Sequence, residues 1–276
     1  MTTKYISSLF VYPIKSCAGI SVEEAQVTPA GFAHDREYML VDERGVFISQ
    51  RKYPRMALIR PRIDRNVMTL EAPDTLSISV DLNDFSGERM SAKVWDDTVD
   101  ALLQSVSINQ WFQEFLHAPG ISLVRFVPDV HRYIDRERLG EGIAESKFAD
   151  QYPITLVSEA SIADLNARLK EKVDATRFRP NIVVSGFEPY EEDTAERLRI
   201  VDSDIVLKIV KPVKRCKIVN VNPQKGLAES DEVLSTLASY RGPQAGKSGI
   251  LFCMKAIVEK GTDRAMRVGD VISLPD

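Results

Sequence analysis

The sequence predicts an α+β protein that is mostly β and contains two consecutive β-rich domains. Short segments of alternating apolar and polar residues recur between turn residues through the first hundred positions, a spacing typical of a small barrel or sandwich. Strand-like segments return after residue 120, with two helical patterns among them. The chain has 276 residues and is 44% hydrophobic, so it can bury one large core or two small ones. We therefore expect an N-terminal small β-barrel-like domain over residues 1–120 and a second β-rich domain with a few helices over residues 121–276.

The first domain is expected to consist of short strands followed by one helix. Strands are predicted at SSLFVY, EYMLVD, LSISV and SAKVW, separated by turn signals such as ERG and SG. Between Ser105 and His117, large apolar residues recur at helical spacing, and the following Pro-Gly pair ends the pattern. These residues are Ile108, Trp111, Phe112, Phe115 and Leu116.

The second domain is expected to open with the strand ISLVRFV and a long polar loop over residues 129–150. The buried strand ITLVS should lead into a helix with Ser158 as its N-cap and with Ile162, Leu165 and Leu169 on one apolar stripe. One more helix is expected near residues 231–240. The remaining strands are predicted at NIVVSG, LRIV, DIVLKIV, CKIVNV, GILFCMKAIV and DVISL.

Composition and charge argue against several classes of protein. The 36 basic residues nearly balance the 40 acidic ones, so a nucleic-acid or membrane-surface protein is not indicated. The N-terminus lacks the apolar core of a signal peptide, and no run of about 18 apolar residues follows it. We expect a cytoplasmic protein that has neither nucleic acid nor membrane as a partner.

The cysteines and the missing motifs narrow the chemistry. Cys17, Cys216 and Cys253 lie far apart, so they form neither a disulfide framework nor a CxxC pair. An iron–sulfur cluster of the plant type needs more clustered thiolates than this chain has and is not expected. The histidines are not at metal-binding spacing, and GxSxG, HExxH, the Walker loop and GxGxxG after a strand do not occur. The kind of site that remains possible is a cysteine thiol combined with cationic side chains that bind an anion.

Cys216 is the strongest candidate because it lies in the basic run KPVKRCK. Neighbouring cations stabilise a thiolate over a thiol, which makes the sulfur a nucleophile and a ligand for soft metals. The alternative is that Cys216 begins a strand and only packs, with the lysines solvated. The charge cluster alone does not decide between the two. Cys17 and Cys253 are predicted to be small buried core residues.

Three other segments carry cations that suit an anionic ligand. In RFRPN, two arginines flank a phenylalanine, and Asn181 offers both a donor and an acceptor. Lys15 and Ser16 follow a strand in YPIKSC, and Arg36 begins another strand in HDREY. The simpler interpretation is surface salt bridges or solvated charge at strand ends, which is the commoner role of such residues. His34 is predicted to be structural.

Together these segments resemble the MOSC superfamily with its N-terminal β-barrel partner domain, in the subgroup of the mitochondrial amidoxime-reducing component and its bacterial relatives. The resemblance spans nearly the whole chain, and its motifs occur in the family's order. They are YPIKSC, HDREYMLVD, FADQYPITLVSEASIADLN, RFRPNIVVSG, RCKIVNVNPQKG and VGDVISL. The resemblance implies that the second domain is a MOSC β-barrel domain that binds the molybdenum cofactor, molybdopterin with its molybdenum. Pyridoxal phosphate binding is implied only at the level of the superfamily.

The resemblance also implies roles for individual residues. Cys216 is similar to the catalytic thiolate that ligates molybdenum in the family. Residues from both domains match cofactor-contacting positions, namely Lys15, Ser16, Arg36, Arg179, Asn181 and Arg215. Asp150 and Ser158 fall in the matching segment from FADQYP to SEAS and are included among the expected cofactor contacts.

By the same resemblance, the chain is expected to reduce N-hydroxylated compounds, such as amidoximes, hydroxylamines and N-hydroxylated purines, to amidines or amines. Electrons are expected from a separate ferredoxin-like protein or flavin reductase, because no ferredoxin-type segment follows the last predicted strand. We expect a monomer. The alternatives are a cofactor carrier or sulfur-relay protein without its own turnover, and a cofactor-free scaffold in which Cys216 only packs.

The predicted loop over residues 129–150 is expected to border the substrate entrance. It contains two glycines and several charged side chains, namely Arg132, Arg136, Arg138, Glu141 and Glu145. Loops of that length in compact domains are commonly functional.

Overall fold

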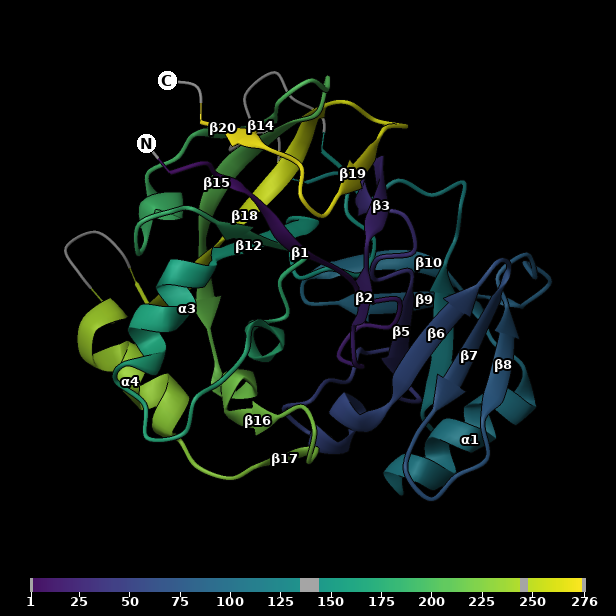
Figure 1. Cartoon of the computed structure of the whole chain (residues 1–276). Coiled ribbons are helices and arrows are strands. Elements are labelled where there is room, and N and C mark those ends of the chain that lie inside the picture. The colour runs from purple at the N-terminus through teal and green to yellow at the C-terminus, as the bar shows by residue number, and fades with distance from the viewer. Residues whose placement is uncertain (1, 135–143, 244–247, 275–276) are drawn as a thin grey trace.

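The computed structural model describes residues 2–134, 144–243 and 248–274 of the chain. Strands dominate it and form two β-rich parts that lie side by side (Figure 1). One part carries helix α1, and the other carries α3 and α4. The prediction of a mostly β, α+β protein with two β-rich parts is confirmed.

An eight-stranded sheet forms the larger part, and its strands are antiparallel except for the pair β12 and β13. Alternate side chains of β12, β13 and β18 point into one apolar core, and the side chains between them pack beneath α3 and α4. Because both faces are covered, these strands are nearly continuous apolar runs in the sequence. The order is β2 (Ile20–Val22), β1 (Tyr5–Val11), β13 (Ile182–Ser185), β12 (Ile154–Ser158), β18 (Ile250–Lys260), β15 (Val206–Arg215), β14 (Arg197–Ile200) and β20 (Ile272–Ser273). A three-stranded sheet of β19 (Ala265–Arg267), β3 (Glu24–Thr28) and β4 (Gly31–Phe32) shares the same core.

The smaller part contains two sheets whose apolar side chains form a second core with α1. Helix α1 (Val106–Leu116) has Ser105 as its N-cap and buries Ile108, Phe112 and Phe115, so the predicted helix is confirmed. One sheet has the order β5 (Tyr38–Val41), β11 (Ser122–Phe126), β10 (Asp97–Leu103) and β9 (Arg89–Val94). The other has the order β6 (Arg60–Asp64), β7 (Val67–Glu71) and β8 (Ile78–Asp81), and the 3₁₀ turn η1 (Pro54–Leu58) precedes it.

The two helices expected in the second half of the chain are also confirmed. Helix α3 (Glu159–Asn166) begins at its N-cap Ser158, and α4 spans Glu232–Arg241. Helix α3 is shorter than predicted, so Leu169 is buried beyond its end. The cause is Asn166, whose side chain both donates to and accepts from the backbone of Val173 at 2.8 Å and so turns the chain.

The strand predicted at CKIVNV is wrong. Strand β15 ends at Arg215, and the chain then forms the 3₁₀ turn η4 (Lys217–Asn220), followed by β16 (Val221–Asn222), which pairs with β17 (Leu227–Ala228). The Asn220 side chain holds this turn against the start of α4, because it donates to Asp231 and accepts from the Leu234 N–H, both at 3.0 Å. Cys216 therefore lies at a bend, as the residue that precedes η4.

Sheet membership crosses the predicted boundary at residue 120. Strand β1 belongs to the eight-stranded sheet, whereas β11 pairs with β5 and β10 in the smaller part. The division into residues 1–120 and 121–276 stays a prediction about domains. What matters for the site is that the segment after β1 passes between the two parts, where the Lys15 N–H donates to the Tyr38 carbonyl at 2.8 Å.

Part of the predicted loop over residues 129–150 lies outside the described residues, namely 135–143, which include Arg136, Arg138 and Glu141. In the described portion, the Arg132 guanidinium pairs with Asp97 and donates to the Lys147 and Ala149 carbonyls at 2.8 Å. That the loop over residues 129–150 borders the substrate entrance stays a prediction.

Candidate functional site

Cys216 lies at the bend after β15 with a partly exposed side chain. A cation from the other part of the molecule contacts its sulfur, since Arg51 Nη1 lies 4.0 Å from Cys216 Sγ. The Arg51 guanidinium in turn stacks on Trp95, 4.5 Å from the ring centroid, and Trp95 packs against Phe47. Lys214, from the basic run itself, donates instead to Ser248. The sequence indicated a cationic setting for this thiol but not that Arg51 would contribute to it.

The Tyr12 ring contacts the guanidinium groups of two of the predicted arginines. The buried ring lies between the guanidinium groups of Arg36 and Arg179, 4.4 and 4.3 Å from its centroid. Gly19 makes room for the ring, since a Cβ at that position would lie 2.5 Å from Tyr12 Cε1. The Tyr12 hydroxyl is buried without a hydrogen-bond partner among the described residues. Burial raises the pKa of Tyr12 to about 12, so the ring is a neutral surface for the two cations.

Three of the predicted residues adopt a backbone conformation that residues other than glycine rarely adopt. Ser16, Arg36 and Arg179 have φ angles of 69°, 48° and 55°. Each costs on the order of 1 kcal/mol relative to a right-handed conformation, and such residues gather at functional sites. The packing must therefore favour this arrangement enough to maintain it.

The Asn181 side chain holds Arg36 in place by a hydrogen bond. It is fully buried, and its Oδ1 accepts from Arg36 Nη1 at 2.9 Å and from the Thr155 N–H at 3.2 Å. Its Nδ2 donates to the Phe10 carbonyl at 3.2 Å. Arg36 also pairs with the buried carboxylate of Asp35. Asn181 thus joins β1, the residues before β5, and β12 through one side chain.

Lys15 and Asp150 form an ion pair beside this group. Lys15 Nζ contacts Asp150 and donates to the Phe148 carbonyl at 2.7 Å, while Trp95 Nε1 donates to Asp150 at 2.8 Å. Burial lowers the pKa of Lys15. Burial would raise the pKa of Asp150, but Lys15 and the Trp95 N–H outweigh it and hold that pKa well below its usual range.

Sequence reasoning missed Lys255 of β18. Its Nζ donates to the Tyr152 carbonyl and to Thr155 Oγ1, both at 3.1 Å. Burial, and then the nearby charge of Arg36, lower the pKa of Lys255 to about 7. The signal in the sequence was a single lysine inside the apolar run GILFCMKAIV, a position at which a charged residue is rare unless paired.

The other predicted residues divide into two groups. Arg215 Nε donates to the Phe252 carbonyl at 2.8 Å and Nη1 to the Phe178 carbonyl at 3.1 Å, which places it beside the turn that ends in Arg179. The Ser16 carbonyl accepts from Gln50 at 2.7 Å. Ser16 is thus held by a residue of the smaller part, whereas both carbonyls that Arg215 binds belong to the larger part.

Ser158 is not brought to this group. It is fully buried, and its hydroxyl accepts from the Ser161 N–H at 3.0 Å as the cap of α3. It lies at the far end of β12 from Thr155, which adjoins Asn181. Three residues along a strand separate the two by roughly 10 Å. A cofactor contact for Ser158 stays a prediction, and its hydroxyl has a structural task already.

Comparison with known proteins identifies the family. Residues 3–119 match the MOSC N-terminal beta barrel domain, and residues 144–273 match the MOSC domain. The human protein named mitochondrial amidoxime-reducing component 1 is 34% identical over 246 residues, which cover 86% of this chain and 72% of that protein. The chain belongs to the MOSC domain family.

Two further comparisons cover most of the chain. A protein of Oryza sativa subsp. japonica named molybdenum cofactor sulfurase is 34% identical over 285 residues, which cover 92% of this chain but 33% of that protein. The crystal structure of the YuaD protein from Bacillus subtilis has a TM-score of 0.45 at 12% identity, over 99% of this chain and 94% of that chain.

The residues at the junction fit the anionic cofactor that the family name implies. Arg179 Nη2 and Arg215 Nη2 are buried, and neither has a hydrogen-bond acceptor among the described residues. An unsatisfied charged donor is costly, so a buried pair of them indicates an acceptor supplied by a ligand. Burial lowers the pKa of Arg179 to about 10, and a bound anion would oppose that shift. Cys216 adds one accessible thiol to the MOSC part of the site.

The two other cysteines behave as predicted. Cys17 and Cys253 are buried in separate apolar cores, and burial raises the pKa of each to about 12. His34, which was predicted to be structural, lies with its Nδ1 3.5 Å from Glu37. In the described part of the chain, no helix is long and apolar enough to cross a membrane. The cytoplasmic location stays a prediction.

Proposed function

We propose that this MOSC protein binds the molybdenum cofactor between its two β-rich parts and reduces N-hydroxylated compounds with electrons from a separate protein. The observation that carries the proposal is the pair of buried, unsatisfied guanidinium nitrogens of Arg179 and Arg215, the second of which immediately precedes the accessible Cys216. The relatives named amidoxime-reducing component support the choice of reaction.

Each residue has a task in this proposal. Arg179 and Arg215 donate hydrogen bonds to the anionic oxygens of the cofactor, and Cys216 supplies the thiolate that ligates the metal. Lys15, Arg36 and Lys255 contribute positive charge in a poorly solvated setting, where it stabilises an anion more than it would in water. When bound, the cofactor supplies two-electron redox chemistry and accepts the oxygen of the substrate.

The side chains around the sulfur control access to it. Arg51 lies against Cys216 and is backed by Trp95, which is 43% exposed. A rigid aromatic ring behind a guanidinium fixes where the charge lies. In our proposal, Arg51 and Trp95 together orient the N-hydroxylated substrate at the exposed side of the Cys216 sulfur.

The test is the molybdenum content and the amidoxime reductase activity of the purified protein with an artificial reduced donor. We expect molybdenum and turnover in the wild type, and loss of both in Cys216→Ser. Lys217→Gln is the matched control, since it changes an exposed neighbour and keeps the thiol. Equal molybdenum in wild type and Cys216→Ser would reject the ligand assignment, and absence of molybdenum from both proteins would support a cofactor-free scaffold.

A second function is supported by the likeness to molybdenum cofactor sulfurase. The chain spans about a third of that protein, so a role in carrying the cofactor or relaying sulfur through Cys216 is the alternative proposal. Bound molybdenum without amidoxime reduction, with a donor that reduces the metal, would favour the carrier over the reductase.

A further inference from the structure

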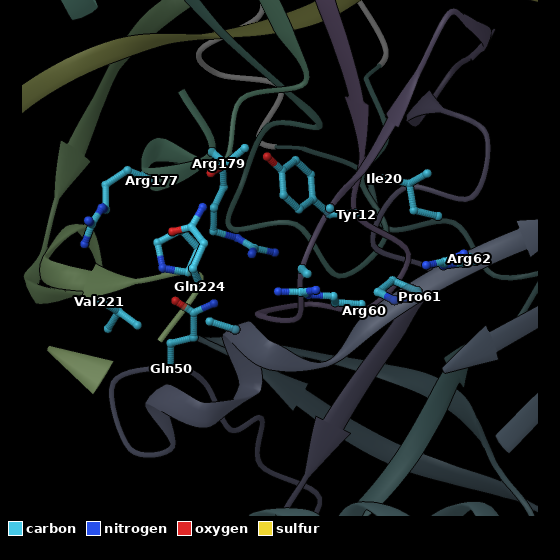
Figure 2. A pocket seen from close by; sticks show the side chains of 15 residues that line it. Tyr12, Ile20, Gln50, Arg60, Pro61, Arg62, Arg177, Arg179, Val221 and Gln224 are labelled. Carbon is cyan, nitrogen blue, oxygen red and sulfur yellow. The ribbon is translucent and has the colours of Figure 1, made fainter. Parts of the chain in front are cut away.

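A cavity of about 400 Å³ opens at the junction of the two parts, and Figure 2 shows the side chains that line it. Tyr12 and Arg179 line it, but Lys15, Arg36 and Asn181 do not. The smaller part contributes Gln50 and the start of β6, and the larger part contributes η2 (Ala175–Phe178) and the segment around β16. Its size lies within the range of small-molecule sites.

The cavity is strongly cationic. Its described lining residues include Arg60, Arg62, Arg177 and Arg179 and no acidic residue. Arg62 pairs with Glu71 at 3.3 Å. The guanidinium groups of Arg60 and Arg177 have no hydrogen bond or salt bridge within the described residues.

Two further groups in the lining lack a partner. Arg179 Nη2 and the Tyr12 hydroxyl are both buried and unsatisfied among the described residues. Arg179 Nη1 is already engaged with the Cys17 carbonyl, and Nη2 is the donor that the proposed function assigns to the cofactor. The case for a second ligand in this cavity therefore rests on Arg60, Arg177 and the Tyr12 hydroxyl. The unsatisfied Tyr12 hydroxyl, together with the guanidinium groups of Arg60 and Arg177 that make no hydrogen bond or salt bridge within the described residues, points to an acceptor that carries negative charge.

The shape of the lining narrows the ligand class. Four arginines line the cavity and no acidic residue does, although Arg62 pairs with Glu71 and Arg177 lies near Asp174 and Glu229 outside the lining. Guanidinium groups suit the oxygens of a dianionic phosphate, which they bind in bidentate fashion. Apolar side chains of Ile20, Pro61 and Val221 border the same cavity and offer a surface to an organic group.

We infer that this cavity binds the phosphate monoester group of an organic ligand, separately from the cofactor. If the proposed function holds, that ligand is the substrate, an N-hydroxylated compound that carries a phosphate. The identification as substrate rests on the proposed function, whereas the phosphate site does not.

The test is calorimetric titration of the purified full-length protein with adenosine 5′-monophosphate, with adenosine as the neutral comparison. We expect the monophosphate to bind and adenosine to bind at least about tenfold more weakly. Arg60→Gln and Arg177→Gln should each weaken binding of the monophosphate by about tenfold and leave molybdenum content unchanged. Arg44→Gln is the control, since Arg44 is exposed and does not line the cavity.

The contrary outcomes are distinct. Equal affinity for adenosine 5′-monophosphate and for adenosine would overturn the phosphate site. So would binding of the monophosphate that neither arginine variant weakens. Loss of molybdenum in folded Arg60→Gln or Arg177→Gln would also overturn it, because the cavity would then hold the phosphate of the cofactor itself. Failure of amidoxime reduction with the monophosphate still bound rejects only the proposed function.

Discussion

At the scale of single residues, some side chains of the candidate site form hydrogen bonds to other residues of the same site. Asn181 was predicted as a cofactor contact, and the structure gives it a second task, since it holds Arg36. Removing a buried group that serves several partners leaves each of them unsatisfied. The effect of such a residue on ligand binding must therefore be separated from its effect on folding.

Asn181→Ala should destabilise the protein by about 2–4 kcal/mol, because the Thr155 N–H and the Phe10 carbonyl lose the Asn181 side chain and Arg36 Nη1 keeps only Asp35. Urea denaturation of cofactor-free protein measures the change. Asn83→Ala, at an exposed position, is the control and should stay within about 0.5 kcal/mol of wild type. A similarly small effect for Asn181→Ala would show that water replaces its contacts.

Lys255 makes stability depend on pH. Its pKa falls from 10.5 to about 7 in the folded chain, mainly because of burial. Below about pH 7 both states are protonated and the full penalty is present. As the pH rises toward 10.5, the folded chain loses this proton first, so the unfolded chain binds more protons and the penalty disappears.

Lys255→Met should therefore be more stable than wild type at pH 6.5, and this advantage should shrink as the pH approaches 9.5. Urea unfolding of both cofactor-free proteins at several pH values gives the difference. The exposed Lys170→Met is the matched control and should follow the wild-type profile. An advantage that stays constant with pH would mean that Lys255 keeps its proton throughout.

At the scale of elements, periodicity and caps predicted most of what the structure contains. The strands ITLVS and GILFCMKAIV and the helix after Ser105 agree because their local patterns match their burial. CKIVNV failed because its apolar alternation does not report the contact of Asn220 with α4. The site residues stay a prediction, and the contacts of Arg51 with Cys216 and of Lys255 with Thr155 could not be predicted, because only the fold brings those residues together.

Ser158 can be tested as an element cap. Ser158→Ala should lower stability by about 1–2 kcal/mol, because the Ser161 N–H at the start of α3 loses its acceptor. Thermal unfolding measures the loss, and molybdenum content of the folded variant measures any further role. Ser107→Ala, which changes a solvent-exposed hydroxyl beside the cap of α1, is the control. Wild-type molybdenum in Ser158→Ala would reject Ser158 as a cofactor contact.

At the scale of the whole molecule, the two β-rich parts share strands and polar contacts. Strand β1 belongs to the larger sheet and continues into the segment whose Ile14 pairs with Tyr38 of β5. Arg36 binds the Asn181 side chain, and Lys15 binds the Phe148 carbonyl. A site built between two parts works only when both are folded and held in one arrangement. These contacts should therefore make unfolding cooperative across the chain.

The chain's two tryptophans, Trp95 and Trp111, both lie in the smaller part, so their fluorescence reports on that part while far-ultraviolet circular dichroism reports on the whole. In wild type we expect the two urea transitions to coincide, as they do for a single cooperative unit. The double variant Asp35→Asn, Arg36→Met removes the bond to Asn181 without leaving a buried carboxylate unpaired. In that variant the fluorescence and dichroism midpoints should separate, whereas Asp42→Asn, Arg44→Met, an exposed pair in the smaller part, should keep them together. Coincident transitions in both variants would mean that the shared strands alone couple the parts and that Arg36 serves the ligand only.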